Sequence, residues 1–251
     1  MNAGGWVVLP VFNEAALLGG VLERVRRACG EGVQLLVVDD HSSDASAGIA
    51  RQAGARVISH CFNMGYGVSL QTGFKTAIEG GASWIVIMDG DGQHDPASIP
   101  ALVAPVARGE ADVVVGSRFL GSPDYHMPWP KRVGVLVFRI MARALADLRV
   151  TDPTSGFQAF SHRAAAFCTH DLFPFDFPDT DMLITLKKAG LRVAEVPALM
   201  HNHPQGKTMH AGLVPYYYVF KMFVSILATT LRESHSYLDR KVEDPPARGA
   251  A

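Results

Sequence analysis

The sequence lacks any pair of cysteines with the spacing of a metal or redox site. Its three cysteines, Cys29, Cys61 and Cys168, form no CxxC pair and no Cys/His cluster. An odd, scattered set of thiols argues against a disulfide-stabilised fold and fits a reducing compartment. We therefore expect a cytoplasmic protein whose ligands are held by oxygen and nitrogen groups rather than by sulfur.

The sequence also lacks an excess of charge of either sign. Its 23 Lys and Arg residues nearly balance its 24 Asp and Glu residues, which gives a formal net charge of -1. A protein with this balance has no global attraction for nucleic acid, so nucleic acid is not an expected partner. A phosphate-bearing ligand would have to be bound by groups placed locally.

Long hydrophobic runs are missing as well. The nearest approach to a membrane span, 213–231, is interrupted by Pro215 and Lys221, whereas a spanning helix needs about 20 strongly apolar residues. We expect an amphipathic helix at 212–231, and its aromatic residues suit a membrane interface. Two roles stay open for it: peripheral docking on the cytoplasmic face of the membrane, or packing on the domain or in a homodimer. The polar tail 232–251 is expected to be disordered.

What the chain does have is an alternation of β-branched runs with helical patterns. Strands are predicted at 6–11, 33–40, 55–59, 84–89, 112–116 and 192–196, and helices at 13–28, 42–53, 67–79, after Pro96, and at 131–148 and 179–189. Asn13, Ser42, Ser43 and Asp95 are the expected helix caps. Continuous apolar strands separated by helices indicate an α/β fold with a mostly parallel sheet covered on both faces.

Polar clusters follow several of these strands, and in parallel sheets such ends meet at one edge where ligands bind. The sharpest cluster is Asp89-Gly-Asp91, directly after an apolar strand. Two carboxylates so close together are costly unless a cation neutralises them. Oxygen ligands suit Mg²⁺ or Mn²⁺, which also bind substrate phosphates. Gly90 and Gly92 allow a tight turn; an ordinary Asp-Gly turn is the alternative.

Two further clusters have weaker signals. Asp40 closes the second strand and could accept hydrogen bonds from a base or ribose, or it could belong to a helix-capping turn. The segment Asn63-Met-Gly65-Tyr-Gly67 precedes a helix and could present backbone N–H groups to a phosphate. No GxGxxG motif follows the first strand, which disfavours a dehydrogenase.

Taken in order, the motifs resemble those of the family 2 glycosyltransferases, which have a GT-A (Rossmann-like nucleotide-diphospho-sugar transferase) fold. The motifs are PVFNE (10–14), VVDDHSSD (37–44), NMGYG (63–67), MDGDGQHDP (88–96), VVGSR (114–118) and DPTSGF (152–157). More narrowly, they resemble the dolichol-phosphate mannose synthases and bacterial polyprenyl-phosphate glycosyltransferases. The resemblance runs from about residue 6 to residue 227 and implies one domain at 1–211, with a nucleotide-sugar half at 1–116 and an acceptor half at 117–211.

The resemblance implies a role for each matching residue. The donor, a nucleotide sugar of the GDP-mannose or UDP-glucose type, would be bound by Pro10, Phe12, Asn13, Glu14, Asp40, Asn63, Gly65, Asp89, Gly90, Asp91 and Gln93. The metal ligands would be Asp89, Asp91 and Gln93. A lipid-phosphate acceptor would be bound by Arg118, Arg132, Asp152, Ser155 and Gly156, although a simple turn also explains Asp152 and Ser155.

One segment departs from the lipid-phosphate branch, which usually has an Arg shortly before a Gly-x-Ser segment. Here His203 takes the place of that Arg, and Thr208 takes the place of the Ser. Because histidine is often neutral at physiological pH, either this part of the phosphate site is weaker or Lys207 supplies the charge.

The implied reaction is displacement at the anomeric carbon with inversion, in which the metal ion neutralises charge on the departing diphosphate. A polyprenyl phosphate is already anionic, so it needs cations rather than a general base, and Arg binds phosphate well. A hydroxyl acceptor would need a base, and Asp179 stands where hydroxyl-using members carry a catalytic carboxylate. Asp181 is expected to stabilise the start of its helix.

Overall fold

The computed structural model describes residues 4–121, 127, 129–170, 173, 178–201 and 223–226. Within these residues, seven strands form one sheet with the order β3-β2-β1-β4-β6-β5-β7. The strands are β1 (Gly5–Val11), β2 (Gln34–Asp39), β3 (Arg56–Ser59), β4 (Trp84–Ile87), β5 (Val113–Ser117), β6 (Gln158–Ser161) and β7 (Val193–Pro197). Every pairing is parallel except those of β6, which is antiparallel to both β4 and β5. The predicted mostly parallel α/β sheet is therefore confirmed.

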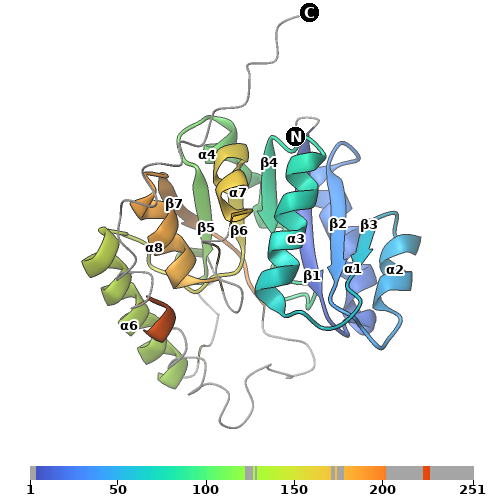
Figure 1. Cartoon of the computed structure of the whole chain (residues 1–251), viewed down its shortest axis with the longest axis horizontal. Helices are drawn as coiled ribbons and strands as arrows, with labels where there is room; N and C mark the ends of the chain where they lie inside the picture. The colour runs from blue at the N-terminus through green and yellow to red at the C-terminus, as the bar shows by residue number, and fades with distance from the viewer. Residues whose placement is uncertain are drawn as a thin grey trace, which may run out of the picture.

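Helices cover both faces of the sheet (Figure 1). One face packs against α1 (Ala15–Cys29), α2 (Ser46–Gln52) and α4 (Ile99–Ala107). The other face packs against α3 (Tyr66–Glu79), α6 (Trp129–Ala146), α7 (His162–Cys168) and α8 (Thr180–Lys188). Two short elements, α5 (Arg118–Gly121) and η1 (Pro96–Ser98), begin directly at the edge where the polar motifs gather.

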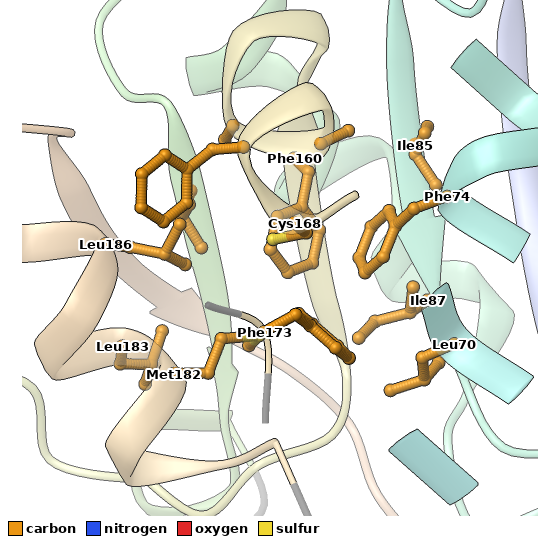
Figure 2. Packing of buried hydrophobic residues seen from close by; sticks show 14 of the residues in the cluster. Leu70, Phe74, Ile85, Ile87, Phe160, Cys168, Phe173, Met182, Leu183 and Leu186 are labelled. Atoms are coloured by element: carbon orange, nitrogen blue, oxygen red, sulfur yellow. The ribbon is translucent and has the colours of Figure 1, made fainter. Parts of the chain in front are cut away.

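Aromatic packing joins the two halves of the sheet on the second face. The ring centroid of Phe74 on α3 lies 4.9 Å from that of Phe160 on β6 and 5.9 Å from that of Phe173, both edge to face. Figure 2 shows these rings between Ile85 and Ile87 on one side and the α8 residues on the other. Because β6 runs antiparallel to β4, the loop that precedes β6 lies at the carboxyl end of β4, whereas α7, which follows β6, begins beside the start of β4.

The elements β6, α7 and α5 were not predicted from the sequence, and three predicted cap residues are wrong. Asn13 has φ of 58° and lies before α1, whose N-cap position is Glu14 and has no side-chain cap bond. Ser42 and Ser43 precede α2, which begins only at Ser46. The Asp95 cap is confirmed, because its carboxylate accepts the N–H of Ala97 at 3.0 Å.

Most of the predicted helix at 212–231 lies outside the described residues, as does the tail at 232–251. One helical turn, 223–226, is described: Ile226 is buried in the core of the α3/α8 face, and Ser225 donates a hydrogen bond to Asp181. At least this turn packs on the domain. Among the residues described, none of the helices combines the length and apolar character that crossing a membrane requires.

Candidate functional site

The loops that follow β1 and β2 are joined by side chains at the carboxyl edge of the sheet. The hydroxyls of Ser42 and Ser46 accept the N–H groups of Asn13 and Glu14, each at 2.9 Å. In return, the side-chain oxygen of Asn13 accepts the N–H of Ser43 at 2.8 Å. Asn13 and Glu14, both predicted to bind the donor, are therefore cross-linked to the loop after β2. The apolar side chain of Phe12 beside them is exposed, and Pro10 is buried in β1.

Asp89 lies at the end of β4 and is held from two sides. The hydroxyl of Tyr66 donates to Oδ1 of Asp89 at 3.0 Å, and the backbone N–H of Asp89 donates to Nδ1 of His94 at 3.1 Å. Burial raises the pKa of the Asp89 carboxyl, while the Tyr66 hydrogen bond and the charge of Arg118 lower it. The carboxylate thus sits in a partly desolvated place where a positive charge would be stabilising.

His94 is a neutral acceptor at neutral pH. Burial lowers its pKa to about 4, and its ring stacks on Phe157 with centroids 4.9 Å apart. Because Nδ1 accepts the Asp89 N–H, the proton of the neutral ring is on Nε2, which lies 3.9 Å from Oδ2 of Asp89. His94 therefore contacts both the DGDGQHDP loop and the DPTSGF loop.

Asp91 is oriented by Gln93. Its Oδ1 accepts the backbone N–H of Gln93 at 2.9 Å, and its Oδ2 accepts the Gln93 side-chain amide at 2.7 Å. The structure thus places Gln93 on Asp91, and its direct bond to a metal stays a prediction. Gly92 has φ of 79°, and a Cβ at Gly90 would lie 3.0 Å from Val11; the turn depends on both glycines.

The donor set of this loop fits a magnesium or manganese ion that shares its ligands with a substrate. Among the described residues there is no group of three or more His, Cys, Asp and Glu residues that could hold a metal alone. Mg²⁺ commonly uses one or two carboxylates and completes its shell with water and substrate phosphates. The side chain of Asp89 is 34% exposed, so its oxygens are accessible to such an ion.

Asp40 has a role inside the protein. Its Oδ1 lies 2.8 Å from Nδ1 of His60 and accepts the N–H of Met64, and its Oδ2 accepts the N–H of Gly65 at 2.8 Å. The side chain is only 6% exposed. Asp40 thus fixes the NMGYG turn that carries Tyr66, and its contact with a ribose or base stays a prediction.

Arg118 and Asp152 form a buried, bidentate ion pair. Nε and one terminal nitrogen of Arg118 each lie 2.6 Å from Asp152, which is fully buried. The backbone N–H of Asp152 and both donors of Thr151 are bound by Glu195 of β7 at 2.8–2.9 Å. The Arg118–Asp152 pair brings the GSR and DPTSGF motifs together, and the charge of Arg118 lowers the pKa of Asp89.

The remaining predicted site residues are placed unequally. Asp179 precedes α8. The pKa of Tyr66 is raised by burial first and then by the charges of Asp89 and Asp179, and a catalytic role for Asp179 stays a prediction. Asp181 is buried and accepts the N–H groups of Asp179 and Met182, in agreement with a structural role. Arg132 is exposed on α6, and its place in an acceptor site stays a prediction. His203 and Lys207 lie outside the described residues.

Three other predicted site residues lie in loops: Ser155 and Gly156 in the predicted acceptor half, and Asn63 in the predicted donor half. Ser155 is buried and accepts the N–H of Phe157 at 3.3 Å, as a turn residue does. Gly156 lies against the Tyr66 hydroxyl and Asp89. Asn63 is exposed at the start of the NMGYG turn.

Sequence reasoning assigned no role to Tyr66, His94 or Glu195. Tyr66 and His94 lie inside the NMGYG and MDGDGQHDP motifs, and this position was the signal that could have marked them as site residues. Their hydrogen-bond partners could not be predicted from the spacing of the motifs. Glu195 gave no signal at all, because it is a lone carboxylate in a short strand.

An α/β sheet with an acidic turn at the end of β4 and an antiparallel β6 beside it defines a nucleotide-sugar transferase of the GT-A class. The comparison with known families agrees: residues 6–167 match the model of glycosyl transferase family 2, and the chain belongs to that family.

Relatives of known name are similar over most of the chain. The polyprenol monophosphomannose synthase of Mycolicibacterium smegmatis is 31% identical over 217 residues, 82% of this chain and 80% of that protein. The UDP-N-acetylglucosamine–dolichyl-phosphate N-acetylglucosaminyltransferase of Methanococcus voltae is 29% identical over 211 residues, 76% of this chain and 83% of that protein.

Among solved structures, the chain is similar to glucosyl-3-phosphoglycerate synthase of Mycobacterium tuberculosis in complex with Mn²⁺, UDP and phosphoglyceric acid. The TM-score is 0.68 at 23% identity, with 90% of this chain and 78% of that chain covered. This similarity establishes the GT-A fold.

Proposed function

We propose that the protein transfers a hexose from a nucleotide-diphosphate sugar to a polyprenyl phosphate in a metal-dependent, inverting reaction. The observation that carries the proposal is the meeting of the Asp89/Asp91 turn with the Arg118–Asp152 pair at one edge of the sheet. The printed names of the two curated relatives, which describe lipid-phosphate acceptors, support the choice of acceptor.

The donor side of the reaction belongs to the acidic turn. Asp89 and Asp91 would hold Mg²⁺ or Mn²⁺ against the donor diphosphate, and the ion would neutralise the charge that develops on it. Gln93 keeps the Asp91 carboxylate in its orientation. As the anomeric C–O bond to the diphosphate breaks, the nucleoside diphosphate departs with the electron pair.

The acceptor side needs positive charge rather than a base. A phosphate oxygen of the lipid is already anionic, and it would form the new bond on the opposite face of the anomeric carbon. Arg118 is held next to the acidic turn by Asp152 and Thr154, which would place its guanidinium beside the phosphate groups of the donor and the acceptor. Arg132, exposed on α6, would guide the lipid phosphate toward it, together with His203 or Lys207.

Transfer of label to lipid is the direct test. Purified protein incubated with Mn²⁺, undecaprenyl or dolichyl phosphate, and each labelled UDP- or GDP-sugar in turn should give an organic-soluble, acid-labile product with at least one donor. The free acceptor alcohol should give none, because the transferred hexose is accepted by phosphate. Label found only in a soluble hydroxyl compound would reject the lipid acceptor.

The alternative function is transfer to a hydroxyl acceptor, either a saccharide or another small molecule, with Asp179 as base. It is favoured by the electrostatic effect of Asp179 on Tyr66, whose hydroxyl binds Asp89. Under this alternative Asp179→Asn removes the base and turnover falls by about 10²-fold or more. Under the lipid-phosphate mechanism no proton has to be removed from the acceptor, so the same variant should keep its turnover.

We further propose that α6 rests on the anionic cytoplasmic surface of the membrane. A stripe of its apolar side chains is exposed: Trp129 (76%), Val133 (51%), Leu136 (47%) and Ile140 (59%). The 4-3-4 spacing of these residues puts them on one helical face. Arg132, Arg139 and Arg143 are exposed beside the stripe, and the α6 sequence has no acidic residue. Apolar residues flanked by arginines are the composition of an interfacial helix.

Vesicle binding should depend on this face. Replacing Val133 and Ile140 together by Ser removes two apolar anchors, and we expect sedimentation with vesicles containing phosphatidylglycerol to weaken by about 10-fold or more. The matched control is Leu199→Ser, which changes a similarly exposed apolar residue, 47%, outside the helix. Equal binding by the double variant and the wild type would contradict the proposal.

The donor base and sugar stay open between the GDP-mannose and UDP-glucose types. Thermal-shift measurements against GDP- and UDP-sugars, with and without Mn²⁺, separate them, because a bound ligand raises the apparent stability. The domain limits 1–211 and 212–231 and a homodimer remain predictions.

A further inference from the structure

We infer that Tyr66 and His94 are positioning residues that fix the Asp89 carboxylate for the metal ion, and that Gly156 keeps the space in which the Tyr66 hydroxyl works. This inference deepens the proposed function and rests on its metal site. None of the three residues needs to touch the ion or the substrate for this role.

Tyr66 determines how the Asp89 carboxylate is turned. Its hydroxyl donates to Oδ1 at 3.0 Å, and a carboxylate that has lost this bond can rotate about its last torsion, which is soft. The tyrosine itself has little freedom, since it begins α3 directly after Gly65, and Asp40 binds the N–H of Gly65. Oδ1 is thus anchored by the protein, and Oδ2 is the oxygen best placed to bind an ion.

His94 fixes the backbone of the same residue. Its Nδ1 accepts the Asp89 N–H, and its ring is clamped against Phe157. Its two neighbours are bonded to the segment that follows β7. The N–H of Asp95 donates to the carbonyl of Leu199, and the carbonyl of Gln93 accepts the N–H of His201. The turn carrying Asp89 is therefore attached to two other loops through one side chain and its neighbours.

Gly156 provides an independent observation. A Cβ added there would lie 3.1 Å from the Tyr66 hydroxyl and 3.7 Å from Oδ2 of Asp89. The first distance is tighter than ordinary van der Waals contact, so the hydroxyl would have to shift by a few tenths of an ångström, which would disturb its hydrogen bond to Asp89. Gly156 is thus needed where the tyrosine hydroxyl, Asp89 and the DPTSGF loop approach one another closely.

The inference is tested by Mn²⁺ affinity. Full-length protein saturated with UDP, and separately with GDP, is titrated with MnCl₂ while free Mn²⁺ is followed by electron paramagnetic resonance. Tyr66→Phe should raise the Mn²⁺ dissociation constant by about 10-fold, the usual effect of one hydrogen bond to a charged group. In turnover assays the apparent KM for Mn²⁺ should rise by a similar factor, and kcat at saturating Mn²⁺ should change less.

A double-mutant cycle separates positioning from a general structural effect. Gly156→Ala should weaken Mn²⁺ binding in the wild-type protein by displacing the hydroxyl, but much less in Tyr66→Phe, where no hydroxyl is left to displace. Additive effects would overturn the link between Gly156 and Tyr66. Thr76→Val is the matched control, because it removes another hydroxyl of α3, bonded to Thr72 at 2.8 Å, and should leave Mn²⁺ affinity unchanged.

For His94, two replacements separate its hydrogen bond to Asp89 from its stacking on Phe157. His94→Asn keeps an acceptor near the Asp89 N–H, and His94→Phe keeps a ring against Phe157 but has no acceptor. Mn²⁺ affinity should be retained better by the Asn variant. Equal affinity in both variants and the wild type would overturn the role of His94.

The controls distinguish failure of this inference from failure of the proposed function. If Asp89→Ala loses Mn²⁺ binding while Tyr66→Phe keeps the wild-type affinity, the positioning role of Tyr66 is wrong and the metal site stands. If the wild type and Asp89→Ala bind Mn²⁺ equally, the metal site itself is wrong, and the inference falls with it.

Discussion

Replacing Asp89 by Asn should lower turnover by at least about 10³-fold and leave the metal-free protein as stable as before. The loss follows because the isosteric amide has no charge to hold the ion that neutralises the departing diphosphate. The preserved stability follows from the surroundings: burial raises the pKa of Asp89, so the fold does not benefit from its negative charge when no metal is bound. A residue whose negative charge destabilises the folded protein but is needed for turnover is expected at a functional site.

Two measurements check this expectation: initial rates across a range of Mn²⁺ concentrations, and thermal unfolding with and without Mn²⁺ and nucleotide. The wild type should be stabilised by Mn²⁺ plus nucleotide and the variant should not. Asp95→Asn is a control from the same loop, since the Asp95 carboxylate binds the N–H of Ala97 and the ring of His201 and is not one of the proposed metal ligands. More than a tenth of wild-type turnover in Asp89→Asn would contradict the proposed role.

The parallel part of the fold could be predicted because its strands carry their own signal. Val7–Leu9, Leu35–Val38 and Val113–Val115 are continuous apolar runs, buried on both faces as a central parallel strand requires. β6 has no such run. Its four residues, Gln158–Ser161, become a strand because they lie between β4 and β5 and pair with both. That environment is created by residues more than 40 positions away, so no local pattern could reveal it.

The site shows the same division between local and long-range information. The polar strand ends located the correct edge of the sheet, because chain direction and strand pairing place them there. The partners of each group could not be foreseen: Asp40 binds Met64 and Gly65, and Arg118 binds Asp152, 34 residues away. Asn13 was expected to cap a helix, but its φ of 58° turns its side chain to the loop after β2. The residue types predicted the kind of chemistry at the site, and tertiary contacts determined the hydrogen-bond partner of each side chain.

Asp152→Ala is expected to have the largest effect on stability, a loss of about 3–5 kcal/mol in the free energy of unfolding. The Arg118 guanidinium is 15% exposed and its partner is fully buried, so the variant would leave a largely desolvated cation without its carboxylate. Asp152→Asn keeps the volume and some hydrogen bonds, and it should cost less. Urea denaturation at neutral pH gives both values.

Activity should fall together with stability, because Asp152 holds the guanidinium that serves the acidic turn. A misplaced Arg118 should lower kcat/KM by about 10²-fold even in Asp152→Asn at a temperature where that variant is fully folded. Asp112→Asn is the matched control: Asp112 also accepts bonds from an arginine, Arg192, at 3.0 Å, but that guanidinium is 56% exposed. Since water can solvate Arg192 when its partner is removed, the control should lose less stability and keep its turnover. Equal losses of kcat/KM in the two variants would mean that Arg118 acts only in folding, and the acceptor phosphate would then have to be bound elsewhere.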